Sequence, residues 1–126
     1  MSALKYSIDK RSLVVTVIYL DNPSYKEWAE MMLDIFQDPD FEPGFSFILD
    51  HRLVQTPQSS EYIKNVVDFI EMHGTDFGTC SWAVITNNQA TYGMMRMAQE
   101  LSGEALSQMK AFSDIDEAKR WLSSFR

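Results

Sequence analysis

The sequence predicts a single α/β domain in which strands and helices alternate. Short runs rich in β-branched and aromatic residues alternate with longer segments whose apolar residues recur at helical spacing. The links between them carry Asn, Asp, Pro and Gly, which are typical of turns and helix ends. The predicted order of elements is ββαβαβαβα, and a chain of 126 residues has the length of one such domain, covering 1–126.

The first two predicted strands form a hairpin. Leu4 to Ile8 alternates weakly between apolar and polar residues, and a polar turn follows. Leu13 to Leu20 is a run of mostly β-branched residues, which predicts a strand buried on both faces. The turn residues Asp21-Asn22-Pro23 end this strand.

The first predicted helix begins after Ser24, which has capping-box spacing to Glu27. In that motif the serine oxygen accepts from a first-turn amide while the glutamate reaches back to the cap. Asp38-Pro39-Asp40 ends the helix. Its core-facing residues are predicted to be Tyr25, Trp28, Ala29, Met32 and Phe36.

Three further strand and helix units follow. Phe45 to Leu49, Trp82 to Thr86 and Met109 to Phe112 are short apolar runs, which is typical of parallel strands. Because a polar link and a helix follow each one, we expect parallel pairing through right-handed crossovers. The helices are predicted to pack through Ile63, Val66, Val67 and Ile70, through Met94, Met97, Ala98 and Leu101, and through Ala118, Trp121, Leu122 and Phe125.

Polar residues mark the predicted ends of the later helices. Asn87 and Asn88 are predicted to cap the third helix, which ends at Gly103. Ser113, paired with Asp116, is predicted to cap the last helix. The predicted centre of the core comprises Phe47, Trp82 and Val84.

Three segments carry a resemblance to a known family: Ile48-Leu49-Asp50-His51-Arg52, Tyr92-Gly93-Met94-Met95-Arg96-Met97, and the segment from Phe112 to Leu122. In order and spacing they resemble the SpoIIAA-like branch of the STAS and SEC14-like proteins, which are small cytoplasmic domains of bacteria. The resemblance spans Tyr6 to Leu122. It implies a STAS-like mixed sheet of four to five strands with helices mainly on one face.

The resemblance also implies a place for regulation. In the better-known members a serine at the start of the second helix is phosphorylated, which breaks a partner complex. The matching position in this chain falls among Thr56, Ser59 and Ser60. Those members carry an Asp-Ser-Ser/Thr-Gly run directly after the strand, whereas this chain has Asp50-His51-Arg52 and a longer loop.

Composition excludes several classes of partner. A formal net charge of -7 disfavours nucleic acid, because the surface repels phosphates. Basic residues are scattered apart from the Lys10-Arg11 and Lys119-Arg120 pairs, and no apolar run approaches the roughly 20 residues that cross a bilayer, so we expect no membrane insertion. The lone Cys80 cannot form an intrachain disulfide, which favours a cytoplasmic location.

The motifs of common enzyme classes are missing from the sequence. Neither a phosphate-binding glycine loop nor a dinucleotide fingerprint occurs, so we expect no cofactor. His51, His73 and Cys80 lack the spacing of metal ligands. Asp50 and His51 are adjacent on a strand and point to opposite faces, so they cannot form a triad with Ser60. We expect that the protein is not an enzyme.

Asp50 and Arg52 are the most informative polar residues, because they stand where a predicted parallel strand ends. Open α/β sheets bind ligands at such ends. The two side chains point the same way. They orient an anionic or hydroxyl-bearing ligand, form a structural salt bridge that tethers the following loop, or place the carboxylate as a helix cap. The predicted ligand-binding or partner-binding residues are Asp50, Arg52, Thr56, Ser59, Ser60, Asn87, Asn88, Tyr92 and Arg96.

Nine methionine and aromatic residues allow an adaptable apolar pocket, a binding face or ordinary core. They are Tyr25, Trp28, Met31, Met32, Phe36, Tyr92, Met94, Met95 and Met97. Met95 and Tyr92 are expected at the flank of the third helix, where an exposed surface would serve self-association, such as a homodimer, or an unknown protein partner. The leading functional hypothesis is a non-enzymatic regulatory or protein-interaction module. The alternative is a carrier or sensor of a small apolar or amphipathic ligand.

Overall fold

The computed structural model describes residues 2–54, 56–106 and 108–125, and its centre is one five-stranded sheet. The strands are β1 (Leu4–Asp9), β2 (Val14–Tyr19), β3 (Ser46–Asp50), β4 (Trp82–Ile85) and β5 (Met109–Phe112). They lie side by side in chain order. β1 pairs antiparallel with β2, and every later pair is parallel. The predicted mixed sheet is therefore confirmed.

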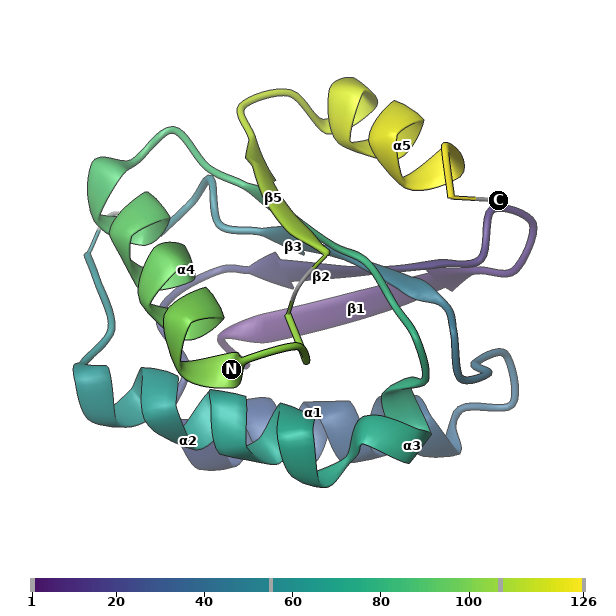
Figure 1. The fold of residues 1–126 in the computed structure, drawn as a ribbon, viewed down its shortest axis with the longest axis horizontal. Coiled ribbons are helices and arrows are strands. Elements are labelled where there is room, and N and C mark those ends of the chain that lie inside the picture. The colour runs from purple at the N-terminus through teal and green to yellow at the C-terminus, as the bar shows by residue number, and fades with distance from the viewer. Residues whose placement is uncertain (1, 55, 107, 126) are drawn as a thin grey trace.

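Most helices cover one face of this sheet. α1 (Tyr25–Gln37), α2 (Ser60–Met72), α3 (Gly74–Phe77) and α4 (Gln89–Ser102) lie on one side, and α5 (Ile115–Ser123) lies on the other (Figure 1). Because each crossover is right-handed and moves one strand further in the same direction, the crossover helices share a face. The single-turn helix α3 was not predicted.

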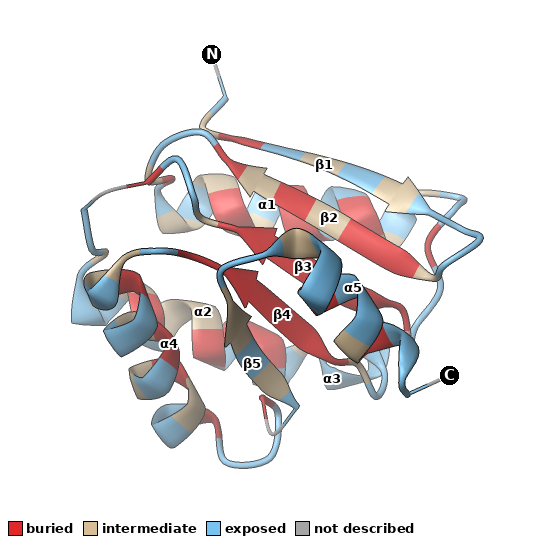
Figure 2. Ribbon diagram, turned by 90° about the horizontal axis from the view of Figure 1, so that it is seen from above, coloured by how far each residue is buried: buried red, intermediate tan, exposed pale blue. Residues whose placement is uncertain are grey.

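The main core lies between the sheet and the crossover helices, and it contains Phe47, Trp82 and Val84 as predicted. A smaller core lies on the opposite face, where Ala118 and Leu122 of α5 pack on the strands. The central strands β3 and β4 are buried along their whole length, whereas the edge strands are partly exposed (Figure 2).

The prediction that the second strand is buried on both faces is confirmed only in part, because on the α5 side Val14 alone is buried. Val15, Val17 and Tyr19 of β2 are buried against the crossover helices, but Thr16 and Ile18 on the other side are only half-buried. The reason is that α5 packs mainly on β4 and β5 and covers Thr16 and Ile18 of β2 only in part.

The predicted helix caps are confirmed in part. Ser24 Oγ accepts from the backbone N–H of Glu27 at 3.1 Å, but the Glu27 carboxylate does not reach back to the cap. It accepts instead from the backbone N–H of Ala3 at 2.8 Å, because the first strand begins beside this helix. The last helix is capped by Asp114 and not by Ser113, since the carboxylate of Asp114 accepts from Asp116 N–H.

The predicted core stripe of α4 is also wrong in detail. Leu101 is exposed and Met95 is buried, the reverse of the expectation, while Met94 and Met97 are half-buried. The helix packs mainly against α2 at the side of the sheet, so the neighbouring stripe turns inward. The buried residues of α4 are Thr91, Met95, Ala98 and Ser102.

Candidate functional site

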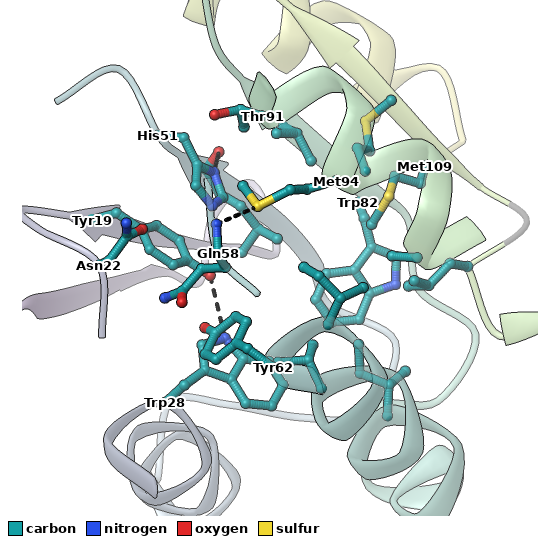
Figure 3. Close-up of a pocket in the computed structure, with 18 residues that line it drawn as sticks. Tyr19, Asn22, Trp28, His51, Gln58, Tyr62, Trp82, Thr91, Met94 and Met109 are labelled. Atoms are coloured by element: carbon teal, nitrogen blue, oxygen red, sulfur yellow. Dashed lines mark hydrogen bonds between the residues drawn. The ribbon is translucent and has the colours of Figure 1, made fainter. Parts of the chain in front are cut away.

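A cavity of about 80 Å³ lies inside the main core, between the sheet and the helices α2 and α4 (Figure 3). Apolar side chains supply most of its wall. Leu49 and Val84 come from the central strands, and Met94, Met95 and Ala98 come from α4. The other apolar lining residues are Ile63, Val66 and Ile70 of α2, together with Leu106 and Met109.

Aromatic side chains with polar atoms lie at one end of the cavity. Trp28 Nε1 donates to Tyr19 Oη at 3.2 Å, and the His51 ring stacks on the Tyr19 ring with centroids 3.9 Å apart. Burial raises the pKa of the Tyr19 phenol, so the group stays protonated. Burial also lowers the pKa of His51 to about 4, against the opposing effects of the Leu49 carbonyl and the Asp50 carboxylate. This end of the cavity is polar but uncharged at neutral pH.

Residues 56–59, which we call the strap, cross the polar end of the cavity. Asn22 Nδ2 donates to the Thr56 carbonyl at 3.0 Å and to Thr56 Oγ1 at 2.8 Å. Gln58 Nε2 donates to the Pro23 carbonyl at 2.7 Å, and its backbone N–H donates to Met94 Sδ at 2.8 Å. Asn22 and Gln58 both line the cavity, so the strap joins the link after β2 to α4 across it.

A second tryptophan lines the cavity without a hydrogen-bond partner. Trp82 is fully buried, and its ring stacks on Phe47 with centroids 4.6 Å apart. Within the described ranges, no acceptor lies within hydrogen-bond distance of Trp82 Nε1. A buried donor without an acceptor is rare in folded proteins, and because Trp82 is fully buried this N–H group is not exposed to the cavity.

Asp50 and Arg52 form a bidentate ion pair at the end of β3. Arg52 Nε donates to Asp50 Oδ1 at 3.0 Å and Nη2 donates to Oδ2 at 2.7 Å. Burial raises the carboxyl pKa of Asp50, but the hydrogen bonds and charge of Arg52 outweigh this effect and lower it overall. The predicted geometry is confirmed, because Asp50 and Arg52 share one side of the strand while His51 turns to the cavity.

Several predicted residues lie together at the carboxyl ends of β3 and β4, which we call the carboxyl edge of the sheet. Arg52, Asn87 and Asn88 line a surface hollow of about 330 Å³, which also borders His51. Tyr92 lines a neighbouring hollow of about 400 Å³ that shares the two asparagines. His51 therefore separates the surface hollow from the internal cavity.

The other predicted residues lie apart from these hollows. Thr56 belongs to the strap, and Ser59 caps α2 by accepting from the Tyr62 backbone N–H at 3.1 Å. Ser60 is exposed in the first turn of α2. Arg96 is exposed on α4 and does not line either hollow. A binding role for these residues stays a prediction.

The described part of the chain disfavours a reactive cysteine and offers neither a metal site nor a membrane-spanning helix. Burial raises the pKa of Cys80 to about 12, which disfavours a reactive thiolate at neutral pH. Over residues 2–54, 56–106 and 108–125, no cluster of three or more His, Cys, Asp or Glu is arranged to hold a metal ion. In the same ranges no helix has the length and apolar character to span a membrane.

Sequence reasoning missed most of the polar atoms that line the cavity. Of the nine methionine and aromatic residues named as possible pocket residues, Trp28, Met94 and Met95 line the cavity and the other six do not. Sequence reasoning did not assign Tyr19, Gln58 or Tyr62 to a site. The available signal was the strand alternation, which places Tyr19 and His51 on the side of the crossover helices.

Comparison with known proteins yields a structural match. Neither a protein-family model nor a curated protein matches the chain. The fold matches the crystal structure of an uncharacterized protein from the DUF3478 family with a SpoIIAA-like fold, from Shewanella loihica PV-4. The two share 16% sequence identity over 97% of this chain and 95% of the other, with a TM-score of 0.66.

The chain has a SpoIIAA-like fold. This finding confirms the resemblance in the sequence, including the mixed sheet and the helices mainly on one face. At 16% identity the match establishes the SpoIIAA-like fold alone, so function has to be argued from the cavity and the carboxyl edge.

Proposed function

We propose that this SpoIIAA-like protein binds a small, largely apolar molecule in its internal cavity and acts as a carrier or sensor without catalysing a reaction. The single observation that carries the proposal is the cavity itself, which is lined mainly by apolar side chains between the sheet and the helices α2 and α4. Ligand sites are typically concave, mostly apolar and equipped with a few convergent polar groups.

The energetic cost of the cavity supports a binding role. Protein cores pack nearly as densely as organic crystals, and an unfilled volume lowers stability by about 24 cal/mol for each Å³. A cavity of about 80 Å³ in this core leaves part of that packing unsatisfied. A molecule that fills the cavity recovers part of this stability, which favours the bound state.

The size and wall of the cavity restrict the ligand. The volume is smaller than the 150 Å³ cavity that accommodates benzene in an engineered protein, so the buried part of the ligand has only a few non-hydrogen atoms. Met94 and Met95 have flexible side chains that can repack around different shapes. The strap supplies an entry point, because hydrogen bonds and not buried apolar side chains attach it to its neighbours.

A protein-interaction module is the second candidate function, and the carboxyl edge favours it. Leu53, 64% exposed, and Tyr92, 45% exposed, flank the hollows lined by Arg52, Asn87 and Asn88. Among the residues that the structure describes, the other large exposed apolar side chains come from separate parts of the fold, which argues for the cavity over a single partner-binding face. They are Leu20, Leu33, Met72, Leu101 and Phe125.

Filling the cavity tests the proposal. Ala98→Met places a larger apolar side chain where Ala98 lines the cavity, so we expect unchanged or higher thermal stability and loss of ligand binding. Xenon is the probe, since it enters apolar cavities, and the methyl resonances of Met94 and Met95 report it by NMR. Met72, which is 78% exposed, serves as the internal reference.

Ala90→Met is the matched control, because Ala90 lies on the same helix but does not line the cavity. Xenon should shift the Met94 and Met95 resonances saturably in the parent and in this control, and not in Ala98→Met. Native mass spectrometry of the parent purified from its source should show a small organic adduct that Ala98→Met lacks. Absence of saturable xenon binding to the parent would contradict the proposal.

A further inference from the structure

A hollow of about 550 Å³ lies between the β1–β2 hairpin and α5, and we call it the hairpin hollow. It is open because α5 packs mainly on β4 and β5 and covers the outer face of β2 only in part. The hairpin turn and the C-terminal end of α5 lie at the same end of the molecule (Figure 1, Figure 2). Among the residues that the structure describes, the hairpin hollow shares no lining residue with the internal cavity.

Two exposed cations line the hairpin hollow. Arg11 comes from the hairpin turn and Lys119 from α5, and within the described ranges neither forms an ion pair. Among the described lining residues the one carboxylate is Asp9, whose Oδ1 accepts from the backbone N–H groups of Arg11 at 2.9 Å and Ser12 at 3.3 Å. This carboxylate is therefore engaged by the turn. In a chain of net charge -7, two cations on one hollow favour an anionic ligand.

Hydroxyl groups and apolar carbon make up the rest of the wall. Ser7 and Ser12 are exposed, and Thr16 and Leu13 are half-buried. Serine and threonine hydroxyls can donate to an anionic oxygen, and the leucine side chain can contact a carbon skeleton. The volume lies within the roughly 300 to 1,000 Å³ of typical small-molecule sites. The wall therefore suits an organic anion better than an inorganic ion.

The backbone of the hairpin turn is strained where it borders the hollow. Leu13 has a φ of 62°, in the left-handed region that glycine and asparagine adopt more readily than leucine. Its side chain packs against the main core, and its carbonyl accepts from the Ser46 backbone N–H at 3.0 Å. These contacts hold the turn that carries Arg11 in one conformation. Strained residues of this kind cluster at ligand-binding sites.

We propose that the hairpin hollow binds a small organic anion. The carboxylate or phosphate group of the ligand lies between Arg11 and Lys119, and its carbon skeleton lies on Leu13 and Thr16. The site is separate from the internal cavity, so this inference does not depend on the proposed carrier function.

Three probes that share one ring test the site. Benzoate carries a carboxylate, benzamide has the same shape without the charge, and phenyl phosphate carries the other anionic group. NMR follows the methyl resonances of Leu13 and Val14, which line the hairpin hollow, and of Met94, which lines the internal cavity. We expect saturable shifts at Leu13 and Val14 with the two anions and not with benzamide. Added salt should weaken this binding, because both cations are exposed.

Charge-removing variants identify the cations. Arg11→Gln and Lys119→Gln should each lower the affinity for benzoate or phenyl phosphate about fivefold, the upper end of the range for an exposed ion pair. Arg120→Gln is the matched control, because Arg120 is an exposed cation on the same helix that does not line the hairpin hollow. It removes the same charge and should leave the affinity nearly unchanged. All three replaced side chains are exposed, so the variants should fold.

The outcomes decide between a site and general attraction. Equal losses of affinity in Lys119→Gln and Arg120→Gln would mean that the anions respond only to overall charge, and the proposal would be wrong. Equal binding of benzamide and benzoate, shifts at Met94 in place of Leu13, or no saturable shift with either anion would also overturn it. Ala98→Met, which fills the internal cavity, should bind benzoate like the parent. The inference and the proposed function therefore fail separately.

Discussion

Asp50 and His51 are neighbours in the chain with opposite surroundings. Asp50 pairs with Arg52 beyond the end of β3, whereas His51 stacks on Tyr19 at the polar end of the cavity. Strand alternation explains the separation, since successive side chains leave on opposite faces. One residue therefore keeps its charge and the next one stays neutral.

Acid titration tests the burial of His51. Its pKa is about 4 in the fold and 6.5 ordinarily, so between these values the unfolded chain binds a proton that the folded chain does not. The stability contributed by neutral His51 is fully present above about pH 6.5 and is lost progressively as the pH falls toward about 4. We expect a loss on the order of 1 to 3 kcal/mol in the free energy of unfolding, measured by urea denaturation.

Carboxylates also respond to acid, so two variants isolate the histidine. His51→Gln should show a shallower decline in stability over this pH window than the parent. His73→Gln, which alters a histidine paired with Asp76 on the surface, should retain the steep decline. Equal slopes in the parent and His51→Gln would refute the assignment.

At the scale of elements, the strap is the segment whose position depends most on side-chain hydrogen bonds. Asn22 holds Thr56, and Gln58 holds both Pro23 and Met94. Segments held by few buried apolar contacts open at lower free energy than the core does. The strap is thus the part of the cavity wall best suited to open for a ligand.

Gln58→Ala should loosen the strap without disturbing the sheet. It removes the side-chain bond to the Pro23 carbonyl, which should lower stability by about 1 kcal/mol and accelerate exchange of the Thr56, Gln58 and Ser59 amides. Hydrogen exchange with mass spectrometry measures the effect. The control is Gln37→Ala at the exposed end of α1, which should leave exchange in the strap unchanged. Unaltered strap exchange in Gln58→Ala would show that other contacts hold the segment.

At the scale of the whole molecule, the sheet separates two cores of unequal size. The larger core depends on the crossover helices and contains the cavity, and the smaller one depends on α5. β4 contributes to both, because Val84 faces the larger core and Ala83 and Ile85 face the smaller one. The stability of the domain therefore depends strongly on this strand.

Val84→Asp should abolish folding, because it buries an unpaired carboxylate at a residue that is only 3% exposed. The expected cost of several kcal/mol is comparable with the whole stability of a small domain. Circular dichroism should show no cooperative melt. Lys64→Asp on the exposed side of α2 is the control and should melt near the parent temperature. A parent-like melt of Val84→Asp would mean that the strand assignment is incorrect.

Part of the candidate site was predictable from the sequence. Strand alternation predicts that Asp50 and Arg52 point the same way, and the position of Asn88 before a helix predicts a cap. Both predictions depend only on residues that are close in the chain. The cavity was not predictable, because its wall combines residues as distant as Tyr19, Gln58 and Met109. The strap depends on Asn22 and Met94 from elements far apart in the chain.

The sequence by itself determined the order of the elements, the antiparallel hairpin and the parallel strands that follow it. Apolar periodicity, turn residues and caps act locally, so they can be read without knowing which surfaces meet. The tertiary structure decided that α4 turns Met95 inward and exposes Leu101, that α5 covers the opposite face, and that an apolar cavity persists beside Trp82. These features depend on how helices pack on a twisted sheet and on one another, and only the assembled chain specifies those contacts.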